Sequence, residues 1–186
     1  GIAKDNFKQL EKKFKNCLDC DIIISSGGVS VGDYDLVKDA LVRFGARIKL
    51  WQVAMRPGKP LAFGVVSSGK GKLIPIFGLP GNPVSAIVSF LAFVNPAISK
   101  MSGRTIFSRD EVPAILDEDI TKKPGLRYFL RANTAWKNGV YRARLTGPQG
   151  SGILRSMSLA NCLLDLPPGP TSFAAGETVA VILTDH

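Results

Sequence analysis

A glycine-rich stretch at residues 25–35, Ser-Ser-Gly-Gly-Val-Ser-Val-Gly-Asp-Tyr-Asp, constrains the fold more than any other part of the chain. It follows an apolar run, Ile22 to Ile24, and leads into a helical pattern, which predicts the turn between a buried strand and a helix. Ligands of α/β proteins bind at this edge, outside the carboxyl ends of the strands. The stretch therefore predicts an α/β fold with a ligand site here, the alternative being a turn that only reverses the chain.

The residue types in this stretch predict the kind of ligand. Glycines permit positive φ angles and let a ligand approach the backbone, serines add hydroxyl groups, and aspartates add acids. Together these donors and acids indicate an anionic ligand accompanied by a metal ion. The residues concerned are Ser26, Gly27, Gly28, Ser30, Gly32, Asp33 and Asp35.

The composition is that of a soluble globular protein that meets anionic partners. Apolar residues make up 45% of the chain, charged residues 21%, and the net charge is +9, which suits a nucleic acid or a phosphorylated small molecule. No apolar run reaches the roughly 18 residues of a membrane span, and the first residues lack the apolar core of a signal peptide. Cys17 and Cys20 have no second pair to complete a zinc site. We therefore expect a cytoplasmic chain that does not bind a membrane.

Helical and strand patterns alternate in the first hundred or so residues. We expect helices over residues 4–18, 35–44 and 83–100, and strands over residues 21–26, 46–54, 61–66 and 73–77. This alternation predicts a three-layer α/β domain with a mostly parallel sheet, in which the hairpin formed by the last two strands makes one side mixed. Because such sheets normally open with a strand, a start at a helix predicts that this domain is N-terminally incomplete.

A loop at residues 55–60 carries two cations in a rigid frame of proline and glycine. Arg56 and Lys59 lie within it, and Pro60 closes it. Proline fixes the φ angle of the backbone, so the frame limits the motion of both cations. The loop therefore presents two cations whose motion is limited.

A second loop, at residues 79–85, opens the last helix of this domain. Asn82 suits the N-cap position and Pro83 the first helical position, and Pro80 precedes them. We expect Ser85 and the free N–H groups nearby to face outward, where a helix N-terminus attracts anions. An ordinary capped helix is the alternative.

After Gly103 the helical pattern gives way to short β-type segments separated by glycine and proline turns. These segments are residues 114–117, 128–132, 141–145, 162–166 and 178–183. They predict a small all-β, barrel-like domain. We therefore expect two domains, at residues 1–103 and 104–186, with a loop at residues 147–152 that holds an oxyanion or only reverses the chain.

Four motifs together resemble the molybdopterin molybdenumtransferase family, which includes the MoeA proteins and the E domain of gephyrin. They are residues 26–32 with Asp35, Arg56-Pro57-Gly58-Lys59-Pro60, Leu79-Pro80-Gly81-Asn82-Pro83-Val84-Ser85, and Gln149-Gly150-Ser151. The resemblance implies a homodimeric enzyme of four domains that inserts molybdate into adenylylated molybdopterin with Mg²⁺, releasing AMP and molybdenum cofactor. This chain resembles the C-terminal part of that enzyme.

The resemblance also implies roles for single residues. Asp35 is the candidate for the acidic catalytic position, where it holds Mg²⁺ or orients a water, although a helix N-cap would also explain an acid there. Lys59 is the second catalytic candidate. The implied substrate contacts are Gly27, Gly28, Ser30, Gly32, Asp33, Arg56, Pro60, Pro80, Asn82, Pro83, Ser85, Arg131 (or Arg127 in another register) and Ser151.

Two other function classes compete with the transferase. A non-catalytic, peptide-binding scaffold of the gephyrin type would have no need for the charges of Asp35, Arg56 and Lys59, so these residues favour the enzyme. A nucleic-acid-binding protein is suggested only by the net charge. The chain lacks an RNP-like aromatic pattern, a zinc finger and a basic recognition helix, so we expect no nucleic-acid partner.

Overall fold

The structure is a computed structural model of the 186-residue chain, and it describes residues 1–3, 6–28, 36–69, 71–104 and 111–184. The chain forms two compact units. Unit 1 comprises Gly1–Val53 and Gly58–Ser89, and unit 2 comprises Ala54–Pro57 and Phe90–His186. The compact units divide the chain after Val53, Pro57 and Ser89. The predicted domain boundary after residue 103 stays a prediction.

The sheet of unit 1 has four strands in the order β1-β5-β4-β2. Their bounds are β1 Ile23–Ser26, β2 Arg47–Trp51, β4 Ala62–Ser67 and β5 Leu73–Leu79. Only β1 and β5 are parallel, whereas β4 pairs antiparallel with both β5 and β2. The α/β content agrees with the sequence. The mostly parallel sheet is wrong for the described strands, because the β4–β5 hairpin and its pairing with β2 supply two antiparallel ladders.

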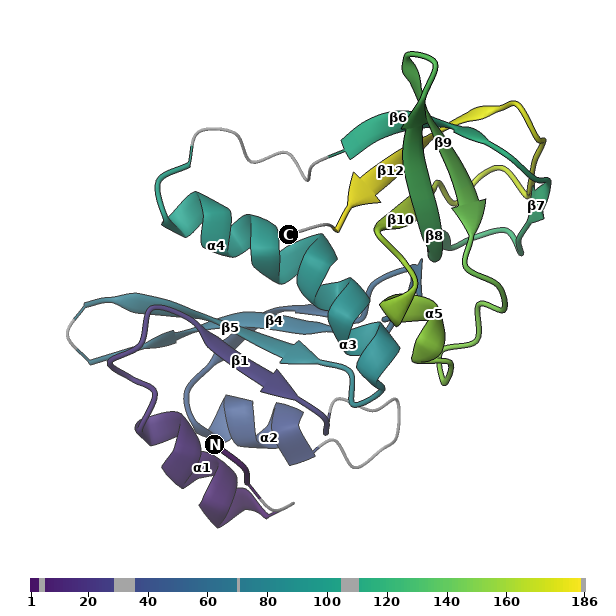
Figure 1. Ribbon diagram of the computed structural model, residues 1–186. Helices are drawn as coiled ribbons and strands as arrows, with labels where there is room; N and C mark the ends of the chain where they lie inside the picture. The colour runs from purple at the N-terminus through teal and green to yellow at the C-terminus, as the bar shows by residue number, and fades with distance from the viewer. Residues whose placement is uncertain (4–5, 29–35, 70, 105–110, 185–186) are drawn as a thin grey trace. The chain divides into compact units, whose positions relative to one another are not determined.

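Helices α1 (Phe7–Lys15) and α2 (Leu36–Arg43) lie on the same side of this sheet (Figure 1). The side chain of Asn6 caps α1 by accepting a hydrogen bond from the N–H of Gln9 at 2.9 Å, which explains why the helix starts after residue 6. Phe14 is buried, and its ring lies 5.5 Å from that of Phe44. The core of unit 1 is therefore built between these helices and one face of the sheet.

The chain is helical from Pro83 to Met101. α3 (Pro83–Ser89) is followed by a π-helical turn, η1 (Phe90–Val94), and by α4 (Asn95–Met101), with Pro96 in the first turn of α4. By length and composition alone Pro83–Met101 could cross a membrane. Core helices of soluble proteins meet the same criterion, so one such helix is only weak evidence for a membrane span.

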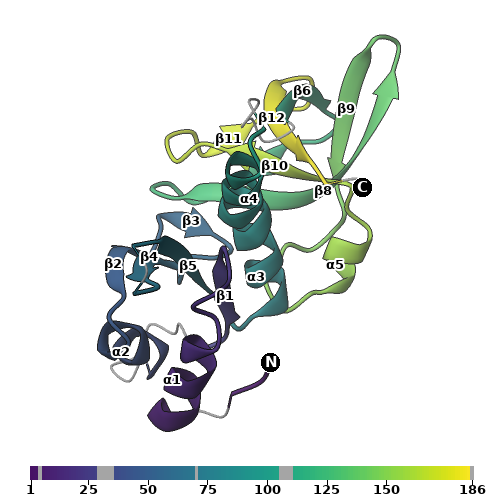
Figure 2. The same cartoon turned by 90° about the vertical axis from the view of Figure 1, so that its left-hand side faces the viewer.

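Unit 2 is a β barrel. Strands β10, β12, β6, β9 and β8 follow one another in the sheet, and an additional pairing of β10 with β8 closes it. The bounds are β6 Glu111–Leu116, β8 Arg127–Lys137, β9 Val140–Leu145, β10 Cys162–Leu166 and β12 Thr178–Leu183, with a separate pair β7 Ile120–Thr121 and β11 Ser172–Phe173 and a short helix α5 Arg155–Ser158. Inward side chains such as Leu116, Leu164 and Val181 are fully buried, and the β8–β9 hairpin extends beyond its neighbours (Figure 2). The predicted barrel-like β domain is confirmed.

A sixth strand joins this barrel from the loop at residues 55–60. β3 (Met55–Arg56) pairs in parallel with the start of β8, so that Met55 lies opposite Arg127 and Arg56 opposite Tyr128. The N–H of Arg127 donates to the carbonyl of Ala54 at 3.0 Å. The sequence predicted this segment as a loop of the α/β domain, because two residues are too few to show a strand pattern.

Candidate functional site

The glycine turn and the turn before α3 lie side by side in unit 1. Because β1 and β5 are parallel, with Ser26 opposite Leu79, both strands end at the same edge of the sheet. The N–H of Gly27 donates to the carbonyl of Leu79 at 3.1 Å, and the hydroxyl of Ser26 donates to the carbonyl of Pro80 at 3.2 Å. The structure thus brings together two of the motifs that the sequence proposed as parts of one site.

The glycines of this region also have a purely structural explanation. Gly27 and Gly28 have φ angles of 90° and 72°, in the left-handed region that disfavours residues with a Cβ. A Cβ on Gly28 would approach Cγ2 of Val37 to 2.3 Å, and a Cβ on Gly81 would approach Cα of Gly27 to 3.3 Å. Packing and backbone conformation therefore account for these glycines, and their contact with substrate stays a prediction.

Asn82 is the N-cap of α3, as the sequence predicted. Its side-chain oxygen accepts hydrogen bonds from the N–H of Ser85 at 3.1 Å and from the hydroxyl of Ser85 at 3.4 Å. Ser85 is only 7% exposed. The Ser85 hydroxyl therefore completes the cap, and its contact with substrate stays a prediction.

Lys59 and Pro60 lie on the unit 1 side of the loop at residues 55–60. The carbonyl of Lys59 accepts from the N–H of Val53 at 2.9 Å, and the carbonyl of Leu61 accepts from the N–H of Gln52 at 2.9 Å. These bonds tie the two ends of the loop together. The side chain of Lys59 is exposed, and within the described residues it has no acidic partner, so its charge is available to an anion.

Arg56 lies on the unit 2 side of the same loop, next to Tyr128. Its guanidinium carbon is 5.8 Å from the centre of the Tyr128 ring, and the ammonium of Lys122 is 5.3 Å from the same centre. Lys122 also donates to the carbonyls of Leu126 and Pro168, at 3.2 and 3.3 Å. The barrel thus fixes Lys122, whereas Arg56 is exposed.

The two arginines that the sequence could not separate have different surroundings. Arg127 donates through Nε to Asp165 at 2.5 Å, so a carboxylate of the protein already balances its charge. Arg131 is fully buried and has no carboxylate partner among the described residues. This difference favours Arg131 over Arg127 as the contact for an external anion.

The hydrogen bonds of Arg131 leave one of its nitrogens unused. Nε donates to the hydroxyl of Ser156 and Nη2 to the carbonyl of Gly150, both at 3.0 Å. Nη1 is buried and has no partner in the described part of the chain. Burial also lowers the pKa of the guanidinium below its usual value, because removal from water disfavours the charged form.

A network that the sequence did not reveal holds the loop after β9 against Arg131. The amide side chain of Gln149 accepts from the N–H of Arg131 at 2.8 Å and donates to its carbonyl at 3.0 Å. The hydroxyl of Thr146 lies 3.1 Å from the same carbonyl and 3.0 Å from the carbonyl of Ser156. The sequence singled out Gln149 and Ser151 as a motif but gave no signal for Thr146 and Ser156, whose roles depend on burial. Ser151 itself is exposed.

Two parts of the chain match known protein families. Residues 1–100 match the family described as a probable molybdopterin binding domain, and residues 113–184 match the MoeA C-terminal region, domain IV. The chain belongs to the molybdopterin-binding MoeA family. The resemblance that the four motifs suggested is therefore confirmed, and the two matches follow each other in the expected order.

Individual relatives from this family agree with the match. Molybdopterin molybdenumtransferases of Nostoc sp. and Haemophilus influenzae are 36% and 34% identical over 98% and 100% of this chain, which covers 42% and 45% of their lengths. The crystal structure of the molybdopterin biosynthesis moea protein from Pyrococcus horikosii has a TM-score of 0.76 at 27% identity, covering 100% of this chain and 43% of that one. The chain thus spans less than half the length of these relatives.

Four of the residues that the family resemblance suggested lie outside the described residues. They are Ser30, Gly32, Asp33 and Asp35. In the described parts of the chain no group of three His, Cys, Asp or Glu side chains could hold a metal ion. The metal role of Asp35 stays a prediction.

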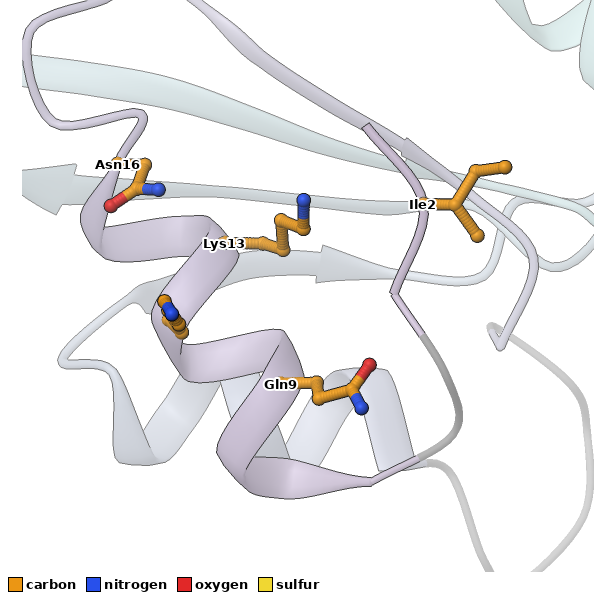
Figure 3. A pocket seen from close by; sticks show the side chains of 5 residues that line it. Ile2, Gln9, Lys13 and Asn16 are labelled. Atoms are coloured by element: carbon orange, nitrogen blue, oxygen red, sulfur yellow. The ribbon is translucent and has the colours of Figure 1, made fainter.

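A hollow of about 370 Å³ lies elsewhere in unit 1, beside α1. It is lined by Ile2, Gln9, Lys12, Lys13 and Asn16, and Lys13 extends from the helix in the direction of Ile2 (Figure 3). None of the residues proposed for the family's substrates lines it. We therefore do not connect this hollow with the candidate site.

Proposed function

We propose that this chain is the C-terminal part of an enzyme of molybdenum cofactor biosynthesis. The enzyme inserts molybdate into adenylylated molybdopterin and releases AMP. The two family matches and the names of the relatives support this function. The observation that carries it within this chain is Arg131, a buried guanidinium with a free Nη1 and no carboxylate partner among the described residues.

The physical argument begins with the cost of burying Arg131. Taking a guanidinium out of water without a counter-charge costs on the order of several kcal/mol. A tetrahedral dianion such as molybdate would supply that counter-charge, and guanidinium groups bind oxyanions through two parallel N–H donors. Arg131 on β8 is therefore the proposed molybdate contact, with Ser151 from the loop after β9 as a second donor.

The other charged residues fit the second substrate. Adenylylated molybdopterin carries a phosphoanhydride, and the exposed cations Arg56 and Lys59 suit its negative charge. We assign Lys59 and Asp35 the catalytic positions. The further proposed contacts are Gly27, Gly28, Ser30, Gly32, Asp33, Pro60, Pro80, Asn82, Pro83 and Ser85.

Three features of the whole enzyme belong to the same proposal. Mg²⁺ would bind through Asp35 and neutralise charge on the anhydride. The full-length protein would be a homodimer, and it would work in the cytoplasm. These features rest on the family resemblance and are open to direct tests of metal binding, mass in solution and cell fractionation.

The function is tested by calorimetric titration of molybdate, and separately of adenylylated molybdopterin, into the chain with Mg²⁺ present. Arg131→Lys keeps the charge but removes the paired donors, so we expect molybdate binding at least about tenfold weaker. Lys59→Ala should weaken the nucleotide-pterin. Arg144→Lys is the matched control, because Arg144 is exposed on the same barrel. Equal molybdate affinity of Arg131→Lys and the wild type would contradict the proposal.

A further inference from the structure

The guanidinium of Arg131 has two edges that the protein uses differently. Nε and the Nη2 hydrogen beside it form one edge, and this edge donates to Ser156 and to the carbonyl of Gly150, each at 3.0 Å. The other edge consists of Nη1 and the second hydrogen of Nη2. Nη1 has no partner among the described residues. One edge is therefore fixed to the protein, whereas Nη1 on the other edge is buried without a partner among the described residues.

Ser156 is held so that it can only accept from Arg131. Its hydroxyl donates to the carbonyl of Ile153 at 2.6 Å, which leaves the oxygen lone pairs for Nε of Arg131. Ser156 is 2% exposed, so water does not readily replace it as the acceptor. The relay from Nε to Ser156 to Ile153 fixes the plane of the guanidinium.

Gly150, the second acceptor, is fixed as well. Its carbonyl also accepts from the N–H of Ile153 at 3.1 Å. The neighbouring Gln149 is bonded to the backbone of Arg131 and, at 2.9 Å, to the carbonyl of Gly147. The loop and the strand that carries Arg131 therefore hold each other in one arrangement.

We propose that Ser156 is a positioning residue, which together with the Gly150 carbonyl aims the free edge of Arg131 at the oxyanion. This inference rests on the proposed function. A fork of two N–H groups matches two oxygens of a tetrahedral oxyanion only when its plane is fixed. Without Ser156, Nε would be a buried donor with no acceptor, and the guanidinium would turn to satisfy it. Ser156 thus acts through Arg131 and does not touch the substrate.

The test compares Ser156→Ala with Ser156→Thr, which keeps the hydroxyl, and with Ser158→Ala. Ser158 is the matched control, because it is exposed on the same short helix and its hydroxyl only donates to the carbonyl of Arg155 at 2.9 Å. Two quantities are measured, the molybdate affinity by calorimetry and the Nε–H signal of Arg131 by ¹H–¹⁵N spectroscopy. In Ser156→Ala we expect roughly tenfold weaker binding together with a shifted, faster-exchanging Nε–H. Ser156→Thr and Ser158→Ala should match the wild type.

The two readouts separate this inference from the proposed function. An unchanged Nε–H signal and unchanged affinity in Ser156→Ala would overturn the positioning role. The wild type could instead show the Ser156-dependent Nε–H signal and bind no molybdate. That result would overturn the proposed function, and with it the proposal that the free edge of Arg131 binds an oxyanion. If Ser156→Ala does not fold, Ser156→Cys carries the same expectation, because its sulfur is only a weak hydrogen-bond acceptor.

Discussion

At the level of single residues, Gly27 and Gly28 allow the cost of a positive φ angle to be compared with the cost of a steric overlap. Both have positive φ angles, but only at Gly28 would a Cβ meet another atom, Cγ2 of Val37 at 2.3 Å. Gly27→Ala should therefore cost only the conformational term of about 1–2 kcal/mol. Gly28→Ala adds a steric overlap worth about 1–3 kcal/mol more. Urea denaturation should therefore give a lower free energy of unfolding for Gly28→Ala than for Gly27→Ala, and the wild type should have the highest value.

The double variant Gly28→Ala/Val37→Ala is the control for this prediction. Removing Cγ2 of Val37 removes the overlapping atom, so the double variant should be more stable than expected from adding the two single changes. Additive effects, or equal losses for Gly27→Ala and Gly28→Ala, would mean that the contact with Val37 does not determine the residue at position 28.

An ion pair distinguishes the two candidate arginines. The sequence places Arg127 and Arg131 four residues apart on one strand, and nothing in the pattern distinguishes them. In the structure, Arg127 forms an ion pair with Asp165. The strand register explains this pair, because Asp165 on β10 lies opposite Phe129, which stands between the two arginines on β8. A contact between segments 38 residues apart cannot be read from local sequence.

At the scale of elements, Asn161 extends the ladder between β8 and β10. Its side-chain oxygen accepts from the N–H of Thr134 at 2.7 Å, and its side-chain nitrogen donates to the Thr134 carbonyl at 2.8 Å. An amide side chain thus imitates the backbone of a paired residue. Asn161→Ala leaves both groups of Thr134 without partners, and we expect a loss of about 2–4 kcal/mol in the free energy of unfolding.

Two further variants test whether this loss comes from the paired bonds. Asn161→Asp keeps the acceptor but loses the donor, so its stability should fall between those of the wild type and Asn161→Ala. Asn133→Ala is the control, because Asn133 is exposed and its bond to Leu159 is long, at 3.4 Å, which predicts a change within about 0.5 kcal/mol. Denaturation is followed by the fluorescence of Trp136, which lies on β8. A similar effect of Asn133→Ala would point to a general sensitivity of this strand.

The elements show how far local sequence determines the fold. Asn82 and the apolar pattern of the barrel strands act within a few residues, and the cap and strands they predict are present. Strand pairing depends on segments distant in sequence, and there the prediction of a mostly parallel sheet is wrong. The candidate motifs were found because glycine, proline and charge are conspicuous. Ser156 was not found from the sequence, because its burial and its hydrogen bond with Arg131 are visible only in the structure.

On the scale of the whole molecule, the chain leaves unit 1 after Val53, returns at Gly58 and leaves again after Ser89. The short excursion supplies β3 to the barrel and carries Arg56, whereas Lys59 lies two residues beyond its end. One loop thus divides its two cations between the units. Family matches alone do not reveal this division, since residues 1–100 match as one domain.

This division predicts that Met55 stabilises unit 2, although unit 1 flanks it in sequence. Met55 is 1% exposed, and its replacement by alanine should cost about 2–5 kcal/mol. The two tryptophans allow the units to be observed separately, because Trp51 lies in unit 1 and Trp136 in unit 2. In a Trp51→Phe background, Met55→Ala should lower the denaturation midpoint reported by Trp136. Leu73→Ala, at a residue 52% exposed in unit 1, should leave that midpoint nearly unchanged. If Met55→Ala instead shifted only the transition of Trp51, measured in a Trp136→Phe background, Met55 would belong energetically to unit 1, and β3 would contribute nothing to the stability of the barrel.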